Sequence, residues 1–421
     1  MRIAIITRNE RIVGGVEGYL DAIIPLLEAA GNEVSLFCEY DTPSASPAIR
    51  HAAQTQTWCV AQMGAEHWLG SLRRWRPELI YSHGLADMEI EAQVFRLAPV
   101  MVFAHDYRAV CISGTKTFAF PATTSCARRF GAGCLMNFYP RRCGGLNPTT
   151  MISDFRQASQ RLALLRSASA ILTASNYVRD EHVRNGLSSK AVRCVGLPVI
   201  DRGHGPSVTS YTNVRESAAT PLRMLFAGRM ETSKGGQLLL EALPLISSEL
   251  VHPLVLTFAG DGAARFEWAR RADEIVRSNP AVRVEFTGWL DSAALTSLFD
   301  SSDLLVVPSL WPEPFGLIGP EAGARGLPAS AFAAGGIPEW LTDGVNGTLA
   351  YGSSRSPAHL ADAIVRSLRD PGEHMRLRRG AIELAKRFSP GRHLDALTMI
   401  IEEISDGGGA PVPDFIPVTH P

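Results

Sequence analysis

The chain has 421 residues, of which 46% are hydrophobic and 20% are charged, and its formal net charge is −1. This length suits two domains of roughly 100–200 residues, with enough apolar side chains for two separate cores. A charge so close to zero argues against nucleic-acid binding, and no apolar run reaches the roughly 18 residues that a membrane span needs. We therefore expect a cytoplasmic protein.

Charge and cysteines both distinguish the two halves of the chain. Residues 1–200 contain 21 basic and 16 acidic side chains, whereas residues 201–421 contain 20 and 26. The N-terminal half is thus the part expected to meet an anionic partner. All seven cysteines also precede residue 200, and none forms a Cys-x-x-Cys pair. We expect them to be reduced thiols.

Residues 1–200 alternate short apolar runs with amphipathic helices, a pattern typical of parallel α/β domains. A turn at Gly14-Gly15 separates the first predicted strand from a predicted helix over Val16–Ala30. Strands are predicted at Arg2–Thr7, Glu33–Cys38, Leu79–Ser82, Val100–Ala104 and Ala170–Thr173. We expect this half to be one Rossmann-like domain.

The pattern restarts after residues 201–220, which are poor in large apolar side chains and predict a linker. Residues 221–390 should form a second Rossmann-like domain. Its strands are predicted at Arg223–Ala227, Leu254–Ala259, Arg283–Thr287, Leu304–Val307 and Pro328–Ala331, and later helices at His359–Leu368 and Glu373–Phe388. A last helix, within Arg392–Ser405, should pack back on the first domain, followed by a flexible tail over 406–421. The predicted class is α/β, with two facing doubly wound domains and a ligand cleft between them.

The second half carries the residues best suited to a phosphorylated ligand. Gly228-Arg229 follows a strand, and Lys234-Gly235-Gly236 opens a helix, so Arg229 and Lys234 could clamp a diphosphate beside free backbone amides. The same residues would also fit a glycine turn with two solvated basic side chains and no role in binding. Gly260, Gly262 and Gly288 end two further strands. They could admit a flat base to the backbone or simply form tight turns.

The strongest motif is Trp311-Pro312-Glu313-Pro314-Phe315-Gly316, with Glu321 eight residues after Glu313. The two prolines should hold Glu313 in a rigid extended loop, and Gly316 should start the helix that carries Glu321. Carboxylates bind vicinal hydroxyls well, which suits a ribose or a hexose. Alternatively, Glu321 is a first-turn carboxylate that the helix dipole stabilises. Gly335–Glu339 adds a second glycine loop suited to phosphate.

Taken together, these residues resemble the retaining GT-B glycosyltransferases of family 4, the glycosyl transferases group 1. The resemblance is densest from Gly228 to Gly347 and includes Asp343-Gly344-Val345-Asn346-Gly347. It implies that residues 1–200 form the acceptor-side domain and that residues 221–390 form the nucleotide-sugar-binding domain. It also implies that Arg229 and Lys234 bind the donor diphosphate and that Glu321 binds the ribose. It also implies that Glu313 and the backbone of Phe315, Gly316 and Leu317 hold the transferred sugar.

In the N-terminal half, the resemblance implies that Gly14 and Gly15 lie over the diphosphate and that His105, of the pair His105-Asp106, contacts the sugar. A lone histidine after a strand can equally be structural. The chain departs from the family at Gly196-Leu197-Pro198, where relatives usually carry an Asn-Gly-Val-Asp-like turn in the interdomain hinge. Since no Asp-x-Asp motif occurs, the arginine and lysine would replace a metal, and we expect no metal and no cofactor.

The segment Cys111–Met151 is predicted to be an insertion. Its four thiols, Cys111, Cys126, Cys134 and Cys143, could bind zinc, although their spacing lacks paired ligands. The insertion also carries Arg128, Arg129, Arg141 and Arg142 near Phe130, Phe138 and Tyr139. These side chains suit peripheral contact with a phosphate-bearing lipid, or they are ordinary solvated arginines.

The sequence therefore predicts a glycosyltransferase that moves a sugar, with retention, from a nucleotide-sugar donor to a glycan or lipid-linked acceptor of cell-surface polysaccharide or glycolipid synthesis. Two other functions stay open. One is a nucleotide-sugar epimerase of the same fold, and the other is a non-catalytic nucleotide-sugar-binding partner. The base, the sugar and the acceptor are not predicted.

Overall fold

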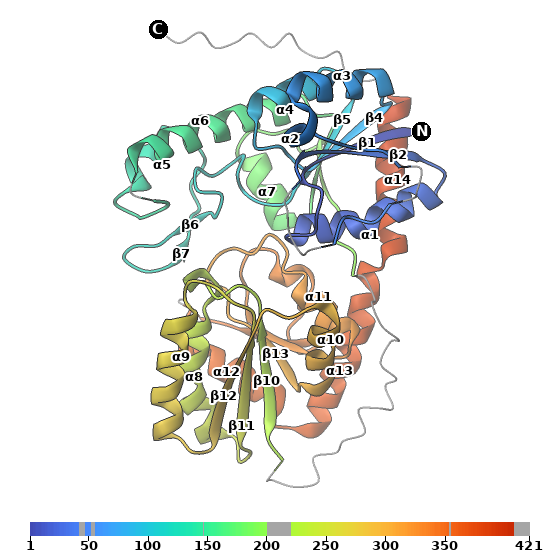
Figure 1. Cartoon of the computed structure of the whole chain (residues 1–421). Helices are drawn as coiled ribbons and strands as arrows, with labels where there is room; N and C mark the ends of the chain where they lie inside the picture. Colours follow the sequence, from blue (N-terminus) through green and yellow to red (C-terminus); the bar gives the residue numbers. More distant parts are fainter. Residues whose placement is uncertain (42–46, 52–54, 146, 200–219, 353–354, 408–421) are drawn as a thin grey trace. The chain divides into compact units, whose positions relative to one another are not determined.

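The computed structural model describes residues 1–41, 47–51, 55–145, 147–199, 220–352 and 355–407. The predicted linker, apart from residue 220, and residues 408–421 of the predicted tail lie outside the described residues. The chain forms two compact units (Figure 1). The N-terminal unit comprises Met1–Thr115, Arg128–Gly196 and the chain from Pro390 on, and the C-terminal unit comprises Lys116–Ala127 and Leu197–Ser389. The segment Lys116–Ala127 thus departs from the predicted division, which assigned it to the N-terminal domain.

The N-terminal unit is built on a seven-stranded parallel sheet of order β3-β2-β1-β4-β5-β8-β9. Its strands are β1 Arg2–Asn9, β2 Glu33–Tyr40, β3 Thr57–Cys59, β4 Leu79–Ser82, β5 Val100–Ala104, β8 Ala170–Thr173 and β9 Val192–Cys194. Its helices are α1 Gly15–Ala29, α2 Val60–Met63, α3 Ala65–Trp75, α4 Met88–Val94, α5 Ala132–Phe138, α6 Pro148–Leu165, α7 Asn176–Arg184 and α14 Pro390–Asp406. The short strands β3 and β9 were not predicted, because three residues give no readable alternation.

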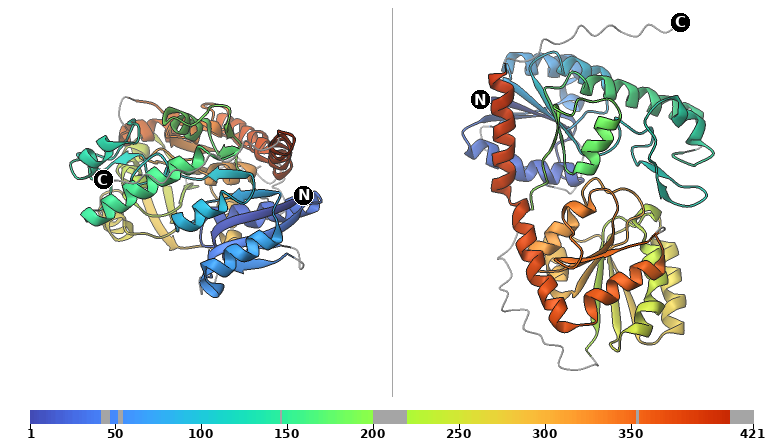
Figure 2. Two further views of the ribbon diagram at one scale, coloured as in Figure 1. Left: turned by 90° about the horizontal axis from the view of Figure 1, so that it is seen from above. Right: turned by 180° about the vertical axis from the view of Figure 1, so that it is seen from behind.

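The burial of β1 fits its position inside this sheet, between β2 and β4. Ile3 to Ile6 are fully buried, because helices cover both faces of a parallel sheet. Helix α1 covers one face together with α14, and the two helices contact each other (Figures 1 and 2). Buried His393 fixes α14, since its Nδ1 donates to the Gly196 carbonyl at 2.8 Å and its Nε2 lies 2.8 Å from the Tyr19 hydroxyl.

The C-terminal unit has a six-stranded parallel sheet of order β12-β11-β10-β13-β14-β15. Its strands are β10 Leu222–Ala227, β11 Leu254–Ala259, β12 Val282–Gly288, β13 Leu304–Val307, β14 Ala329–Phe332 and β15 Gly347–Ala350. Its helices are η2 Thr232–Lys234, α8 Gly236–Glu249, α9 Arg265–Ser278, α10 Ser292–Ser301, α11 Ile318–Ala324, η3 Ile337–Glu339, α12 Pro357–Leu368, α13 Pro371–Ala385 and η4 Lys386–Phe388. A two-stranded ribbon, β6 Thr117–Phe118 with β7 Thr124–Ser125, completes the unit.

Helices α8, α9 and α12 cover one face of this sheet, and α10, α11 and α13 cover the other (Figure 1). The first face holds the main apolar core, in which Trp268 packs against Phe226 and Phe258. The edge strand β15 was not predicted. None of the helices among the described residues has the length and apolar character needed to cross a membrane.

Candidate functional site

The strand order of the C-terminal unit places β10 between β11 and β13, so the chain leaves neighbouring strands in opposite directions at their carboxyl ends. Such a switch point is where doubly wound sheets bind ligands, because the diverging loops leave a crevice. The loop that follows β10 carries Arg229 and Lys234, and the loop that follows β13 carries Glu313. The predicted residues therefore converge on the edge of the sheet where a ligand would be expected.

Lys234 and Glu313 form an ion pair at this point. The Lys234 Nζ lies 2.7 Å from the Glu313 Oε1, and the two side chains are 19% and 6% exposed. Ser309 donates to the same carboxylate oxygen at 2.5 Å, and the ammonium lies 4.9 Å from the ring centroid of Trp311. A lysine held by a carboxylate, a hydroxyl and an aromatic ring is a preorganised cation. Sequence reasoning assigned both residues to the donor but did not predict their contact.

Backbone contacts fix the loop that presents Glu313. The Leu310 amide donates to the Ser233 carbonyl at 2.8 Å, which ties this loop to the turn before α8. The Gly336 amide donates to the Glu313 carbonyl at 2.7 Å. Gly335 has a φ of +62°, and a Cβ there would lie 2.6 Å from the Glu313 nitrogen. The second glycine loop therefore serves as a backbone brace for Glu313.

The residues that follow Glu313 differ in burial, and they lead into helix α11. The Phe315 ring is buried against Phe388, and its carbonyl accepts a hydrogen bond from the Trp340 Nε1 at 2.7 Å. Gly316 adopts a φ of +87°, and α11 begins at Ile318, two residues later than predicted. Leu317 precedes α11, and half-buried Glu321 lies in its first turn. The carboxylate of Glu321 thus lies where the prediction placed it, near the start of this helix.

The glycines at the ends of β10, β11 and β12 pack against one another. The Gly228 amide donates to Ala259 at 2.9 Å, and the Gly260 amide donates to Gly288 at 2.8 Å. Gly260 and Gly262 have φ values of +132° and +155°, and a Cβ on either would collide with the backbone of a neighbouring loop. Contacts within the protein thus already require both glycines. Gly288, with a φ of +74°, has open space at its Cβ position, which leaves room for a ligand.

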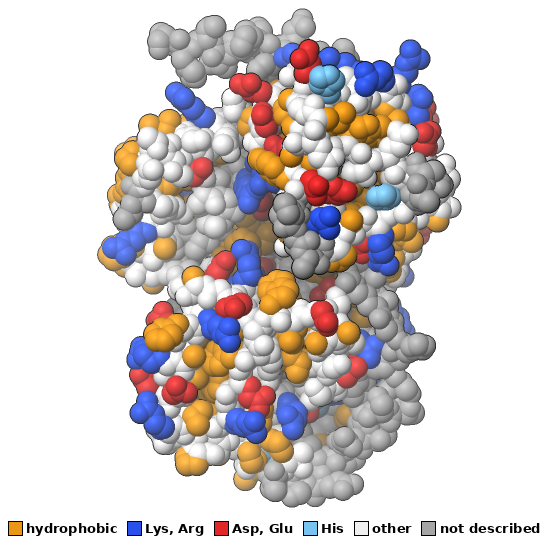
Figure 3. Space-filling view, viewed as in Figure 1, with side chains coloured by type: hydrophobic (Ala, Val, Ile, Leu, Met, Phe, Trp, Pro, Cys, Tyr) orange, Lys and Arg blue, Asp and Glu red, His pale blue; other side chains and the backbone are white. Residues whose placement is uncertain are grey.

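Arg229 lies on the surface of this unit. Its side chain is 63% exposed, and its Nη1 lies 3.0 Å from the Glu231 carboxylate. Figure 3 shows basic and acidic side chains interspersed on the exposed face of the C-terminal unit. Of the two predicted clamp residues, Lys234 is the one that the surrounding side chains hold in place.

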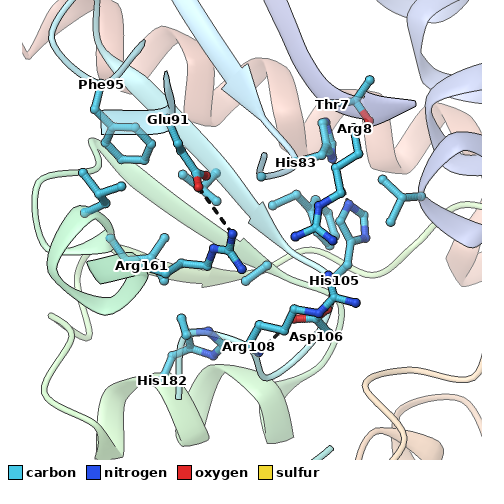
Figure 4. Close-up of a pocket in the computed structure, with 18 of the residues that line it drawn as sticks. Thr7, Arg8, His83, Glu91, Phe95, His105, Asp106, Arg108, Arg161 and His182 are labelled. Carbon is cyan, nitrogen blue, oxygen red and sulfur yellow. Dashed lines mark hydrogen bonds and ion pairs between the residues drawn. The ribbon is translucent and has the colours of Figure 1, made fainter. Parts of the chain in front are cut away.

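The N-terminal unit has a cavity of about 250 Å³ at its own switch point, where β1 lies between β2 and β4 (Figure 4). Thr7, Arg8 and Asn9 line it from β1. The remaining walls come from the segments after β4 and β5 and from α1, α4, α6 and α7. Its polar lining residues there are Glu17, His83, Glu91, His105, Asp106, Arg108, Arg161 and His182.

His105 lies directly after β5 and pairs with a second histidine. Its Nε2 is 2.8 Å from the Nδ1 of His83, which follows β4. Burial lowers the pKa of His105 to about 4, against the opposing effect of Asp106. Burial and then His105 lower the pKa of His83 well below its usual value. Both rings are therefore neutral at pH 7, and each can donate one hydrogen bond and accept another.

The sequence prediction missed Arg8, His83, Arg108 and Arg161. The first two carried a usable signal, because each directly follows the apolar core of a predicted strand. Arg161 lies in the C-terminal half of α6, and no local pattern distinguishes it from a solvated arginine. Gly14 and Gly15, which the sequence did single out, are both exposed at the start of α1.

The predicted insertion forms the β6–β7 ribbon and α5, and it ends inside α6. Arg128, Arg129, Arg141 and Arg142 are exposed, whereas Phe138 is buried. Cys111 is buried, and Cys126, Cys134 and Cys143 are half-buried. No group of three or more His, Cys, Asp or Glu side chains is arranged to hold a metal ion among the residues that the structure describes.

Comparison with known proteins bears on the C-terminal unit first. Residues 209–384 match the model of the family "Glycosyl transferases group 1". The chain is 31% identical over 222 residues to the glycogen synthase of Mycobacterium tuberculosis, which covers 52% of this chain and 50% of the relative. It is 33% identical over 178 residues to the D-inositol 3-phosphate glycosyltransferase of Mycobacterium leprae, covering 41% and 39%. The matches thus span half or less of these curated relatives.

Solved structures extend the comparison to the whole chain. HepE of Anabaena in complex with UDP superposes with a TM-score of 0.66 at 17% identity, covering 96% of this chain and 100% of that one. This likeness shows the fold. The chain has the GT-B fold, with two Rossmann-like α/β units, as the sequence predicted.

Proposed function

We propose that this protein is a retaining glycosyltransferase of family 4, which moves a sugar from a nucleotide-sugar donor to a glycan or lipid-linked acceptor. The observation that carries the proposal is the Lys234–Glu313 pair at the switch point of the C-terminal sheet, inside the segment that matches the glycosyltransferase family model. A fixed cation beside a carboxylate suits a substrate that contains both a diphosphate and a sugar.

In this proposal the C-terminal unit binds the donor. Lys234 neutralises the leaving diphosphate, and Glu313 both positions the Lys234 ammonium and accepts from a sugar hydroxyl. Glu321 binds the ribose. Arg229, which rests on Glu231 at the surface, swings onto the diphosphate only when the donor is present. The pairing of Lys234 with Glu313 supports this arrangement, because a preorganised cation loses little free energy in reorganisation.

The N-terminal unit provides the acceptor side. Its pocket places the neutral pair His83–His105 at the carboxyl ends of β4 and β5, where the pair can orient a hydroxyl by donating and accepting. We place the reaction in the synthesis of a cell-surface polysaccharide or glycolipid in the cytoplasm. The exposed arginines of residues 128–142 would give peripheral contact with anionic lipid.

Substitution of Lys234 tests the proposal. We expect Lys234→Ala to weaken UDP binding by about 10- to 150-fold, because a charge-assisted hydrogen bond to phosphate contributes about 1.5–3 kcal/mol. Calorimetry with the full chain measures this affinity. Lys386→Ala is a matched control, since Lys386 forms an ion pair of the same 2.7 Å length with Glu383 on the surface of the same unit. Equal UDP affinity in both variants and the parent would remove Lys234 from the site.

Incubation with UDP-, GDP- and ADP-sugars distinguishes the three candidate functions. Slow hydrolysis of one donor supports the transferase, because water then replaces the acceptor. Formation of an epimeric nucleotide sugar supports an epimerase, and binding without turnover supports a non-catalytic partner. The anomer of the released or transferred sugar, read by NMR, tests retention.

Removal of divalent cations tests the proposed role of the lysine. Because Lys234 supplies positive charge to the leaving diphosphate, we expect turnover to persist in EDTA. Turnover that EDTA abolishes and Mg²⁺ or Mn²⁺ restores would show that a metal does this work instead.

A further inference from the structure

Three arginines from different elements enter the pocket of the N-terminal unit. Arg8 comes from β1, Arg108 from the segment after β5, and Arg161 from α6 (Figure 4). In Figure 4, Arg8 and Arg161 extend into the pocket from opposite sides. At about 250 Å³ the cavity is slightly smaller than the roughly 300–1,000 Å³ of typical ligand sites, so it suits a small charged group with part of its carrier.

The carboxylates of the pocket neutralise only two of these arginines. Arg108 pairs with Asp106 at 3.1 Å, and Arg161 lies 3.5 Å from Glu91. The third lining carboxylate, Glu17, accepts instead from the Asn9 amide at 2.9 Å.

Arg8 lacks such a partner within the described part of the chain, where no carboxylate lies at ion-pair distance. Its Nη2 donates a long hydrogen bond of 3.4 Å to the Leu85 carbonyl. Burial, and then the charges of Arg108 and Arg161, lower the pKa of Arg8, while Asp106 and Glu39 act in the opposite direction. A half-buried cation that feels two other cations is one that a bound anion would stabilise.

Further donors in the pocket have no hydrogen-bond partner. Among the buried side-chain atoms without one are the Thr7 Oγ1 and the Arg161 Nε, both from lining residues. Thr7 is only 1% exposed, so an unused hydroxyl there costs free energy unless a ligand accepts from it. These orphan groups and Arg8 together exceed what the two oxygens of a carboxylate can satisfy. A phosphate ester offers three terminal oxygens, and the planar guanidinium fork matches them.

We propose that this pocket binds the acceptor of the sugar through a phosphate group, with Arg8, Arg161 and Thr7 as its ligands. The inference rests on the proposed function, which it deepens by naming the acceptor class. That class is a phosphorylated polyol or sugar, or the phosphate headgroup of a lipid. Neutral His83–His105 would then lie beside the carrier rather than beside the anion.

The test is calorimetry on the full chain without nucleotide, with glycerol 3-phosphate and glucose 6-phosphate against glycerol, glucose and glucuronate. We expect the two phosphate esters to bind and the neutral compounds not to bind. Arg8→Gln should weaken phosphate-ester binding by about 10- to 150-fold, and Arg8→Lys should keep part of it. Arg96→Gln, an exposed arginine outside the pocket, should match the parent. Stronger binding of glucuronate than of glucose 6-phosphate, or binding that Arg8→Gln leaves unchanged, overturns the proposal.

Two further measurements keep the outcomes distinct. Co-sedimentation compares the binding of the parent and of Arg8→Gln to phosphatidylglycerol vesicles and to phosphatidylcholine vesicles. If the parent binds phosphatidylglycerol vesicles and Arg8→Gln does not, the phosphate group belongs to a lipid headgroup. UDP affinity is measured separately. If UDP binds and no phosphate ester or anionic vesicle does, this inference fails while the proposed function stands. Phosphate-ester binding without any nucleotide binding would instead reject the proposed function. If Arg8→Gln unfolds at a clearly lower temperature than the parent, Thr7→Val is used as the test variant instead, and we expect the same loss of affinity for phosphate esters.

Discussion

The two units have the same strand order around their first strand, but the switch point is built mainly from glycine backbone in one unit and from side chains in the other. In the C-terminal unit, glycine backbone fills the ends of β10 to β12, and one lysine and one glutamate complete the site. In the N-terminal unit, the pocket is lined by side chains from β1, from the segments after β4 and β5, and from α1, α4, α6 and α7. The difference suits the two proposed ligands. A nucleotide can be recognised by backbone and by a few charges, whereas an acceptor needs a side-chain surface that can vary between proteins.

The buried polar groups show the same contrast. The N-terminal unit buries the chain Tyr81–Tyr19–His393, with 2.6 Å between the hydroxyls and 2.8 Å to the His393 Nε2. In the C-terminal site the buried charge of Glu313 is compensated directly by Lys234 and Ser309. The first arrangement depends on the protonation of His393 and the second on an ion pair, and the two can therefore be disturbed by different changes.

The largest expected effect concerns the backbone of the C-terminal site. Gly260→Ala places a Cβ against the Gly228 carbonyl at a φ of +132°, and we expect it to lower the free energy of unfolding by about 2–5 kcal/mol. Gly288→Ala, at a φ of +74° with open space around it, should cost only about 1 kcal/mol. Urea unfolding of both variants checks the pair. Equal losses would mean that close packing between these loops is not what the glycines provide.

The next effect separates the two carboxylates of the C-terminal unit. Glu313→Ala should leave UDP affinity nearly unchanged, because Lys234 loses the partner that positions it but the site also loses a negative charge that opposes the diphosphate, while turnover falls about 100-fold. Glu313→Gln should lose nearly as much turnover if the negative charge stabilises an oxocarbenium-like state. Glu321→Ala should weaken UDP and the sugar nucleotide alike, because the ribose belongs to both.

Calorimetry and steady-state kinetics give both quantities for the carboxylate variants. A loss of UDP affinity that is the same in Glu313→Ala and Glu321→Ala would contradict this division of roles. An early thermal transition in both Glu313 variants, with poor binding of every ligand, would instead show that Glu313 only braces its loop.

The C-terminal site could be predicted because its parts are close in sequence. Proline-flanked Glu313 and the glycines near Lys234 each lie in a short run with a readable backbone requirement. The sequence could not predict that Gly335 packs on Glu313, since that contact depends on how β14 lies beside β13. Of the residues that line the pocket of the N-terminal unit, only His105 was assigned to the site from the sequence. Its arginines lie up to 153 positions apart, between Arg8 and Arg161, and tertiary structure alone brings them together.

The strands were predicted well where burial on both faces gives a continuous apolar run. Leu79–Ser82, Val100–Ala104 and Leu304–Val307 were predicted to the residue. The edge strand Gly347–Ala350 was missed, because a four-residue run with a glycine and only one large apolar side chain carries no strand signal.

The smallest expected effect tests the protonation chain of the N-terminal unit. Because Gly196 offers a carbonyl, the Nδ1 of His393 must donate, and its Nε2 then accepts from Tyr19 when the ring is neutral. Burial lowers the pKa of His393 to about 4, although the Gly196 carbonyl acts in the opposite direction. The group stays neutral in the folded unit while the unfolded chain takes up a proton near pH 6.5. The contribution of His393 to the free energy of unfolding is therefore fully present above about pH 6.5, and it is lost as the pH falls from there through about 4.

This loss can be assigned to His393 by removing its titration. His393→Gln keeps a donor and an acceptor but does not titrate, so its unfolding free energy should fall less steeply between about pH 6.5 and pH 5, by up to about 1.4 kcal/mol per pH unit. His83 and His105, whose pKa values are also lowered, still titrate in this variant and keep part of the slope. His252→Gln, a half-buried histidine of the C-terminal unit, is the control and should retain the full slope. Urea titrations across this pH range measure the difference. Parallel curves for the parent and His393→Gln would mean that His393 is already protonated in the folded unit, with Tyr19 turned to accept from it.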